Sequence, residues 1–190
     1  MTATQTTQID IQRYHYILAR GTAPTLKCIK PSSLICLPKG LKIDNIRLKV
    51  RGLEMMLLCK GAQMEVVLIF NRKMLQEILD NQKVRDFLAI YNYPTQNDLD
   101  LHLEHLKKRL QGYFDAKNEF AHEVGLFLGY PFEDVLDFIK KDKRCYFSGY
   151  WKVFNNPQEA LKIMNAYDLA KMQIINDCIQ GKKYFEIFGN

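Results

Sequence analysis

Two adjacent hydrophobic, β-rich segments constrain the fold of this chain more than any other feature. The segments LEMMLLCK and QMEVVLIF are separated by Gly61 and Ala62, which predicts a β-hairpin. The segment RCYFSGYWKVF alternates like a further strand. Strands and helices do not alternate regularly along the chain, so a doubly wound parallel sheet is not expected. We expect an α+β fold in which a small, mostly antiparallel sheet, the hairpin 53–70 plus the strand 144–154, packs against several helices.

Helical periodicity and helix-ending residues predict most of the remaining secondary structure. The predicted helices are 9–20, 43–51, 72–80, 82–91, 96–112, 119–128, 131–141 and 157–180. The helix 96–112 carries leucines at helical spacing, namely Leu99, Leu103, Leu106 and Leu110. This stripe is typical of a buried helix face. In contrast, the stretch 21–40 contains Pro24, Pro31 and Pro38 and is expected to be irregular or to form only short turns.

The composition is that of a soluble globular protein. The chain has 190 residues, of which 47% are hydrophobic and 25% are charged. We expect one domain, residues 1–190, with residues 1–8 as a flexible tail. The N-terminus has no apolar signal region, and no apolar run approaches the roughly 18 residues of a membrane helix. We therefore expect a cytoplasmic protein that does not associate with membranes.

The net charge of +6 is concentrated in one segment. Residues 27–51 contain Lys27, Lys30, Lys39, Lys42, Arg47, Lys49 and Arg51 against the single acidic residue Asp44. The rest of the chain is neutral. Such a segment attracts phosphates, anionic cofactors, nucleic acid or an acidic protein surface. The alternative interpretation is a solvated face that only aids solubility.

The cysteines do not form a recognisable disulfide or zinc pattern. Their number, 5, is odd, and no CxxC motif is present. Lys27 and Lys30 flank Cys28 and favour its thiolate, so Cys28 is the candidate reactive thiol.

The segment EFAHEVGLFLGYP is the most distinctive motif. On a helix, His122, Gly125 and Gly129 would share one side, where the two glycines leave room for a ligand or a neighbouring backbone. His122 is then a candidate hydrogen-bond partner or general base, with Glu123 as its neighbour. The alternative is close helix packing on the glycines, with His122 simply hydrogen-bonded. Leu126 replaces the second histidine of HExxH, so a zincin-type zinc site is excluded.

A pair of histidines lies beside the leucine stripe. His102 and His105 have a spacing that can ligate a metal, with Asp98 nearby. Arg109 on the same side would repel the cation, so we expect an exposed polar stripe and no metal site.

The predicted strand 144–154 has one face that combines aromatic side chains with a lysine. These residues are Tyr146, Ser148, Tyr150, Lys152 and Phe154. Such a face can stack a base or flavin ring and neutralise a phosphate. A sheet face covered by a helix needs the same aromatic residues, so packing is the alternative.

Three sequence blocks resemble a bacterial family of unknown function, the domain of unknown function 3793. The blocks are GTAPTLKCIKPSSLICLPK, HEVGLFLGYPFEDV and SGYWKVF, and the resemblance spans roughly residues 10–185. The family occurs largely in anaerobic, clostridia-like bacteria. Relatives often have His-Cys where this chain has Gly21 and Thr22, so any chemistry of that pair is absent here. The resemblance implies a link to redox or metal physiology but no activity.

We expect one pocket formed by Pro24 to Leu26, His122 with Glu123, and Tyr150 to Lys152. The expected ligand-binding residues are Pro24, Thr25, Lys27, Lys30, His122, Gly125, Gly129, Tyr150 and Lys152, and the candidate catalytic residues are His122, Glu123 and Cys28. The protein would bind an anionic small molecule or cofactor, as a redox- or metal-linked accessory protein. No motif assigns a reaction or a cofactor.

Two alternative functions use the basic segment. One is nucleic-acid binding through residues 27–51, although no nucleic-acid-binding motif is present. The other is docking of an acidic protein partner, such as a flavodoxin-like protein.

Overall fold

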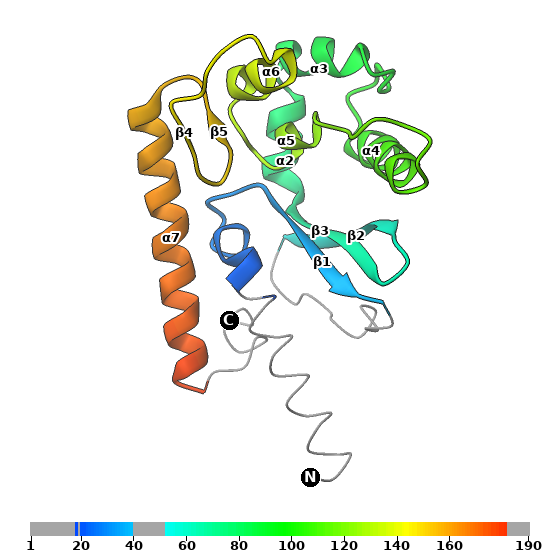
Figure 1. Ribbon diagram of the computed structural model, residues 1–190. Coiled ribbons are helices and arrows are strands. Elements are labelled where there is room, and N and C mark those ends of the chain that lie inside the picture. The colour runs from blue at the N-terminus through cyan, green and yellow to red at the C-terminus, as the bar shows by residue number, and fades with distance from the viewer. Residues whose placement is uncertain (1–17, 19, 40–51, 182–190) are drawn as a thin grey trace.

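The computed structural model describes residues 18, 20–39 and 52–181 and has an α+β fold (Figure 1). After helical residues 20–26 the elements are β1 (Ser32–Pro38), β2 (Leu53–Lys60), β3 (Met64–Asn71), α2 (Arg72–Leu79), α3 (Gln82–Ala89), α4 (Leu99–Phe114), α5 (Val124–Phe127), α6 (Phe132–Lys140), β4 (Phe147–Ser148), β5 (Lys152–Val153) and α7 (Pro157–Ile179). The α+β prediction is thus confirmed. The predicted helix 43–51 and residues 1–8 lie outside the described residues, and the single domain stays a prediction.

The main sheet is antiparallel, with strand order β1-β3-β2. The predicted hairpin is confirmed as β2 and β3. The third strand of the main sheet is β1, which lies in the stretch predicted to be irregular. Residues 144–154, which were expected to complete this sheet, are not part of it. A proline is tolerated here because β1 is an edge strand, and Pro38 is its last residue.

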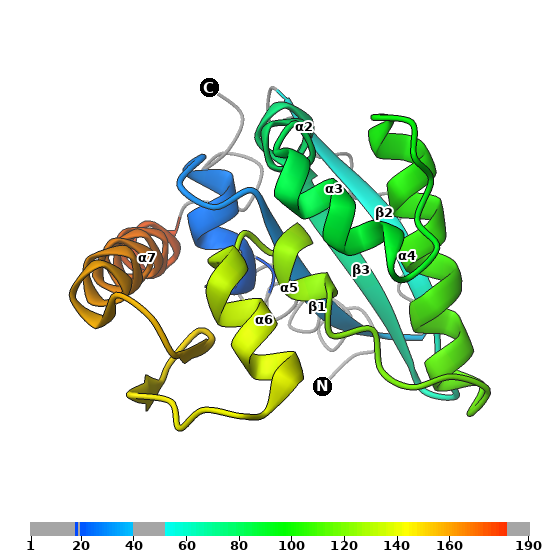
Figure 2. The same ribbon diagram turned by 90° about the horizontal axis from the view of Figure 1, so that it is seen from above.

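The central strand β3 separates two hydrophobic cores. Val66, Leu68 and Phe70 face a core formed with α2 to α6, whereas Val67 and Ile69 face residues 20–26 and α7. Figure 2 shows α2, α3 and α5 over one side of the strands, and α7 beside the N-terminal helical residues. Burial on both faces explains why β3 has a nearly continuous apolar sequence.

Residues 21–26 are helical, although they lie in the stretch predicted to be irregular. Of the predicted helix 9–20, residues 18 and 20 are helical and the others lie outside the described part of the chain. Ala23 and Leu26 are buried against the sheet, and the hydroxyl of Thr22 donates to the carbonyl of Leu18 at 2.7 Å. Packing of these side chains overrides the unfavourable helix propensity of Pro24.

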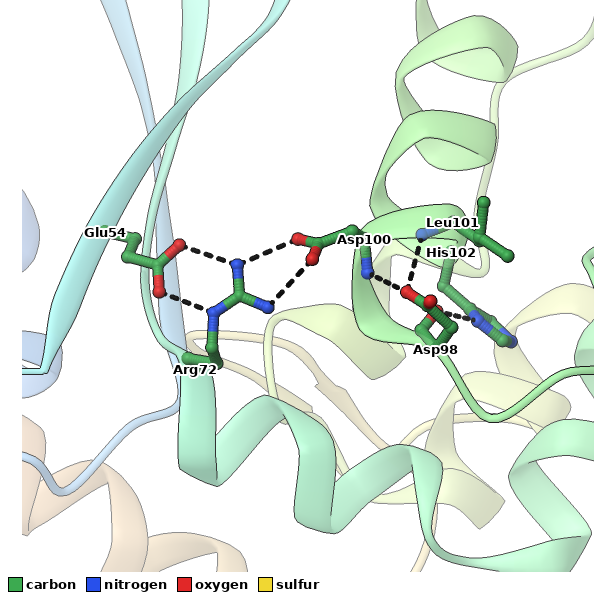
Figure 3. Close-up of polar contacts among 6 residues, drawn as sticks. All are labelled: Glu54, Arg72, Asp98, Asp100, Leu101 and His102. Carbon is green, nitrogen blue, oxygen red and sulfur yellow. Dashed lines mark hydrogen bonds and ion pairs between the residues drawn. The ribbon is translucent and has the colours of Figure 1, made fainter.

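The leucine stripe of α4 is confirmed, since all its members are buried. A doubly paired arginine fixes this helix beside the sheet. Arg72 is the first residue of α2. Its Nη2 donates to Glu54 of β2 and to Asp100 of α4, and both hydrogen bonds are 2.8 Å long (Figure 3). Asp98 caps α4 by accepting the amide of Asp100 at 2.9 Å. One guanidinium therefore ties three elements together.

The predicted helix 119–128 and the predicted strand 144–154 are both longer than the elements that the structure contains. Helical residues within the predicted helix 119–128 are limited to α5, and residues 144–154 form a two-stranded hairpin, β4 and β5, instead of one strand. The amide of Gly149 donates to the carbonyl of Trp151 at 3.0 Å and closes the turn. A Cβ at position 149 would lie 2.6 Å from Met164 Sδ, so the turn packs directly on α7.

Candidate functional site

A pocket of about 360 Å³ lies between α5, α6 and the β4–β5 hairpin. It is lined by Leu34, Phe120, His122, Val124, Gly125, Leu128, Tyr130, Asp134, Val135, Phe138, Trp151 and Lys152. Most of these side chains are aliphatic or aromatic, and the polar groups among them are few. This combination of an apolar body and few polar groups is typical of sites for small organic ligands.

Asp134 holds the hairpin wall of the pocket in place. This buried carboxylate of α6 accepts hydrogen bonds from Trp151 Nε1 at 2.7 Å, from the Phe154 amide at 3.0 Å and from the Asn155 amide at 2.8 Å. Asn155 Nδ2 adds a fourth bond at 3.1 Å. The fixed indole stacks on Tyr130, with ring centroids 5.5 Å apart and planes 27° apart. Asp134 is therefore a positioning residue whose oxygens are already occupied.

His122 and Lys152 supply the polar edge of the pocket. The half-buried His122 ring makes edge contacts with Phe120 and Phe138, at centroid distances of 5.2 and 5.1 Å. Lys152 Nζ lies 5.4 Å from the centroid of Phe138. Within the described part of the chain, neither side chain has a hydrogen-bonding or ion-pair partner, so both can donate to a bound anion.

Gly125 lines the pocket beside Val135 and Tyr130. A Cβ at this position would lie 3.0 Å from Val135 Cγ2 and 3.2 Å from Tyr130 Cδ2, both from residues that line the pocket. The predicted grouping of His122, Gly125 and Lys152 is thus present in the structure, although His122 precedes α5 and is not on a long helix.

The predicted glycine pair does not form one groove. Gly129 has φ of +74°, and a Cβ there would lie 2.4 Å from Pro31. It borders a different pocket, together with Pro31 and residues of α2. Gly129 is needed for a left-handed backbone and for close packing on Pro31.

Glu123 points away from the pocket, into a buried polar network. Its carboxylate pairs with Arg109 of α4, whose Nη2 lies 3.3 Å from Oε2, and it accepts the hydroxyl of Tyr93 at 3.1 Å. Burial and the nearby Glu123 charge raise the pKa of Tyr93 well above its usual value. Both oxygens of Glu123 therefore already have partners within the protein.

The predicted block Pro24 to Leu26, and the neighbouring Lys27 and Cys28, lie outside this pocket. Pro24 and Thr25 are buried, and the Thr25 hydroxyl contacts the Ser33 hydroxyl at 2.8 Å. Lys27 is exposed, as is Cys28, whose Sγ is 3.7 Å from Asn71 Nδ2. None of these four residues lines the pocket with His122.

Tyr150 and Lys30 belong to a separate cluster near α7. The Tyr150 hydroxyl donates to Asp168 at 2.7 Å, and its ring packs edge-on against Tyr167. Of the basic segment 27–51, residues 40–51 lie outside the described part, so the alternative functions that depend on this segment remain predictions.

Of the predicted polar stripe on α4, Asp98 is exposed, whereas His105 and Arg109 are half-buried. His102 is fully buried, with Nδ1 2.7 Å from the Asp98 carbonyl oxygen. The neighbouring His105 places Nε2 3.0 Å from the Tyr91 carbonyl oxygen. Both imidazoles therefore pair with backbone groups.

Several pocket residues were not predicted from the sequence. Phe120, Tyr130, Phe138 and Trp151 form its aromatic walls, and Asp134 orients the tryptophan. The sequence signal for these residues is their closeness along the chain to His122 and Lys152. The turn at Gly149 folds the predicted strand 144–154 back on itself and brings Trp151 to the pocket.

The fold and the pocket define a small α+β protein with one apolar, aromatic-walled candidate site bordered by a lysine and a histidine. A family model described as "Protein of unknown function (DUF3793)" matches residues 18–188, so the chain belongs to this family. No curated protein and no solved structure matches the chain. Of the helices in the described ranges, none has the length and apolarity needed to cross a membrane.

Proposed function

We propose that this chain is a cytoplasmic small-molecule-binding protein whose ligand combines a flat apolar body with an anionic group. The carrying observation is the pocket itself, with its aromatic walls and with Lys152 and His122 at its edge. Rings of Trp151, Tyr130 and Phe138 can contact a planar ligand body. The ammonium group favours a carboxylate, sulfonate or phosphate at the edge.

The charge and the size of the pocket distinguish this proposal from nucleic-acid binding. A nucleic-acid site needs a basic surface that follows several phosphates. The pocket offers one lysine and a volume of about 360 Å³, which suits a single small molecule. The proposed role as a redox- or metal-linked accessory protein would require that this molecule be a cofactor or a metal-binding compound.

A matched pair of fluorescent probes tests the proposal. Anilinonaphthalene sulfonate is aromatic and anionic, whereas phenylnaphthylamine has a similar body without charge. We expect the anionic probe to bind more tightly, and Lys152→Gln to weaken its binding about fivefold, as suits an exposed charge. The neutral probe should bind both proteins equally.

Lys83→Gln is the matched control, because Lys83 is an exposed lysine of α3 outside the pocket. It should leave the dissociation constants of both probes unchanged. Equal losses in the two lysine variants would mean that the probe responds to net charge alone, and the proposed site would be wrong.

A further inference from the structure

Lys30 is a buried lysine outside the pocket described above. Lys30 is only 7% exposed. Its Nζ lies 5.4 Å from the ring centroid of Tyr130 and 5.9 Å from that of Tyr167. Among the residues that the structure describes, no carboxylate pairs with it. Lysines are rarely buried to this degree without a compensating anion.

The backbone around Lys30 directs it to this place. After the helical residues 20–26 the chain reverses through Cys28, which has φ of +54°, and the Lys30 amide donates to the Pro24 carbonyl at 3.2 Å. The turn places Lys30 beside Tyr167 of α7, the helix that lies next to the N-terminal helical residues (Figure 2).

A second lysine faces the same cluster from α7. Burial, and then the charge of Lys171, lower the pKa of Lys30 to about 8. Lys171 has its own pKa lowered by burial and by Arg20, while Asp168 acts in the opposite direction. The carboxylate of Asp168 is engaged by the Tyr150 hydroxyl at 2.7 Å. Lys171 Nζ lies 4.2 Å from the ring centroid of Tyr150, and this ring packs against Tyr167, which Lys30 also contacts. The two lysines therefore border one cluster of aromatic rings.

We propose that Lys30 and Lys171 bind a phosphate group, at a second site between residues 20–31 and α7. A phosphate carries roughly 1.5 to 2 negative charges at neutral pH and can accept from both ammonium groups. The site is separate from the pocket because neither Lys30 nor Lys171 lines the pocket, although Tyr130 contacts Lys30 and also borders the pocket.

Thermal unfolding with inorganic phosphate, against sodium chloride at equal ionic strength, tests the site. We expect phosphate to raise the unfolding midpoint of the wild type by about 3–6 °C beyond the chloride control. Lys30→Met should abolish this rise. The same variant without phosphate should unfold at the wild-type midpoint or higher, because it removes a buried, uncompensated charge.

The exposed Lys27→Met is the control and should retain the full phosphate effect. Lys171→Met provides a second variant on a different element and should reduce the effect. A phosphate rise that persists in Lys30→Met, or a wild type that responds equally to phosphate and chloride, would overturn the proposal.

A titration distinguishes specific binding from general stabilisation. With lysines labelled by ¹³C reductive methylation, bound phosphate should move the Lys30 titration from about pH 8 toward higher pH, because an anion favours the charged amine. The groups that face Lys30 are Tyr130, Tyr167 and Lys171. An unchanged titration would contradict the site.

Glycerol 3-phosphate, compared with glycerol and with inorganic phosphate, identifies the source of the phosphate group. Tighter binding of the ester would indicate a phosphorylated small molecule, and tighter binding of the free ion would indicate inorganic phosphate. Binding of neither would overturn the proposal, whereas the probe titration of the Lys152 pocket would be unaffected.

Discussion

Replacing Glu123 by alanine should lower the free energy of unfolding by about 3–5 kcal/mol. The carboxylate is 1% exposed and receives Arg109 from α4 and the hydroxyl of Tyr93. Its removal leaves a partly buried guanidinium and a buried hydroxyl without their acceptor. Chemical denaturation followed by circular dichroism measures the change.

The matched control is Glu119→Ala, an exposed glutamate on the same segment, which should change stability by at most about 0.5 kcal/mol. The double variant Arg109→Met with Glu123→Leu should recover much of the loss, because it removes both charges together. A loss below about 1 kcal/mol in Glu123→Ala would show that the network contributes little and that Glu123 is available for another role.

Asp134→Ala should destabilise the protein by about 3 kcal/mol or more and also abolish binding of the anionic probe. The substitution removes one acceptor from Trp151, from two consecutive backbone amides and from the Asn155 side chain. The hairpin wall then loses its anchor on α6. Probe binding measured at a temperature where the variant remains folded separates the two effects.

Glu133→Ala supplies the control for this substitution. Glu133 is the preceding residue of α6 and is exposed, so its loss should leave stability within about 0.5 kcal/mol and probe binding unchanged. If Asp134→Ala remained as stable as the wild type, or bound the probe normally, the proposed positioning of Trp151 would be incorrect.

The strongly periodic parts of the fold could be predicted from the sequence. The hairpin of β2 and β3 follows from two apolar β-rich segments around a glycine, and α4 follows from its leucine stripe. The strand β1 could not be predicted, because its two serines, its last residue Pro38 and the preceding Pro31 indicate a loop. It forms because Ser32 to Pro38 pair with the central strand, a long-range effect that local patterns do not contain.

The candidate site shows the same limit. His122, Gly125 and Lys152 could be selected as residue types suited to a ligand site, and the structure brings them to one pocket. Their separation from Pro24, Thr25 and Tyr150 depends on the reversal at Gly149 and on the shortened helix α5, which tertiary packing decides. Glu123 was chosen as the neighbour of His122, yet consecutive side chains here point in different directions.

The most direct test of the proposed pocket uses its only tryptophan, Trp151, as a reporter. In a two-dimensional NMR titration with anilinonaphthalene sulfonate, we expect the single indole N–H resonance to shift and to saturate at the dissociation constant found by fluorescence. Gly125→Ala, which crowds Val135 and Tyr130, should weaken both responses together. Saturable probe binding that leaves the Trp151 resonance unmoved would place the ligand elsewhere and contradict the proposed function.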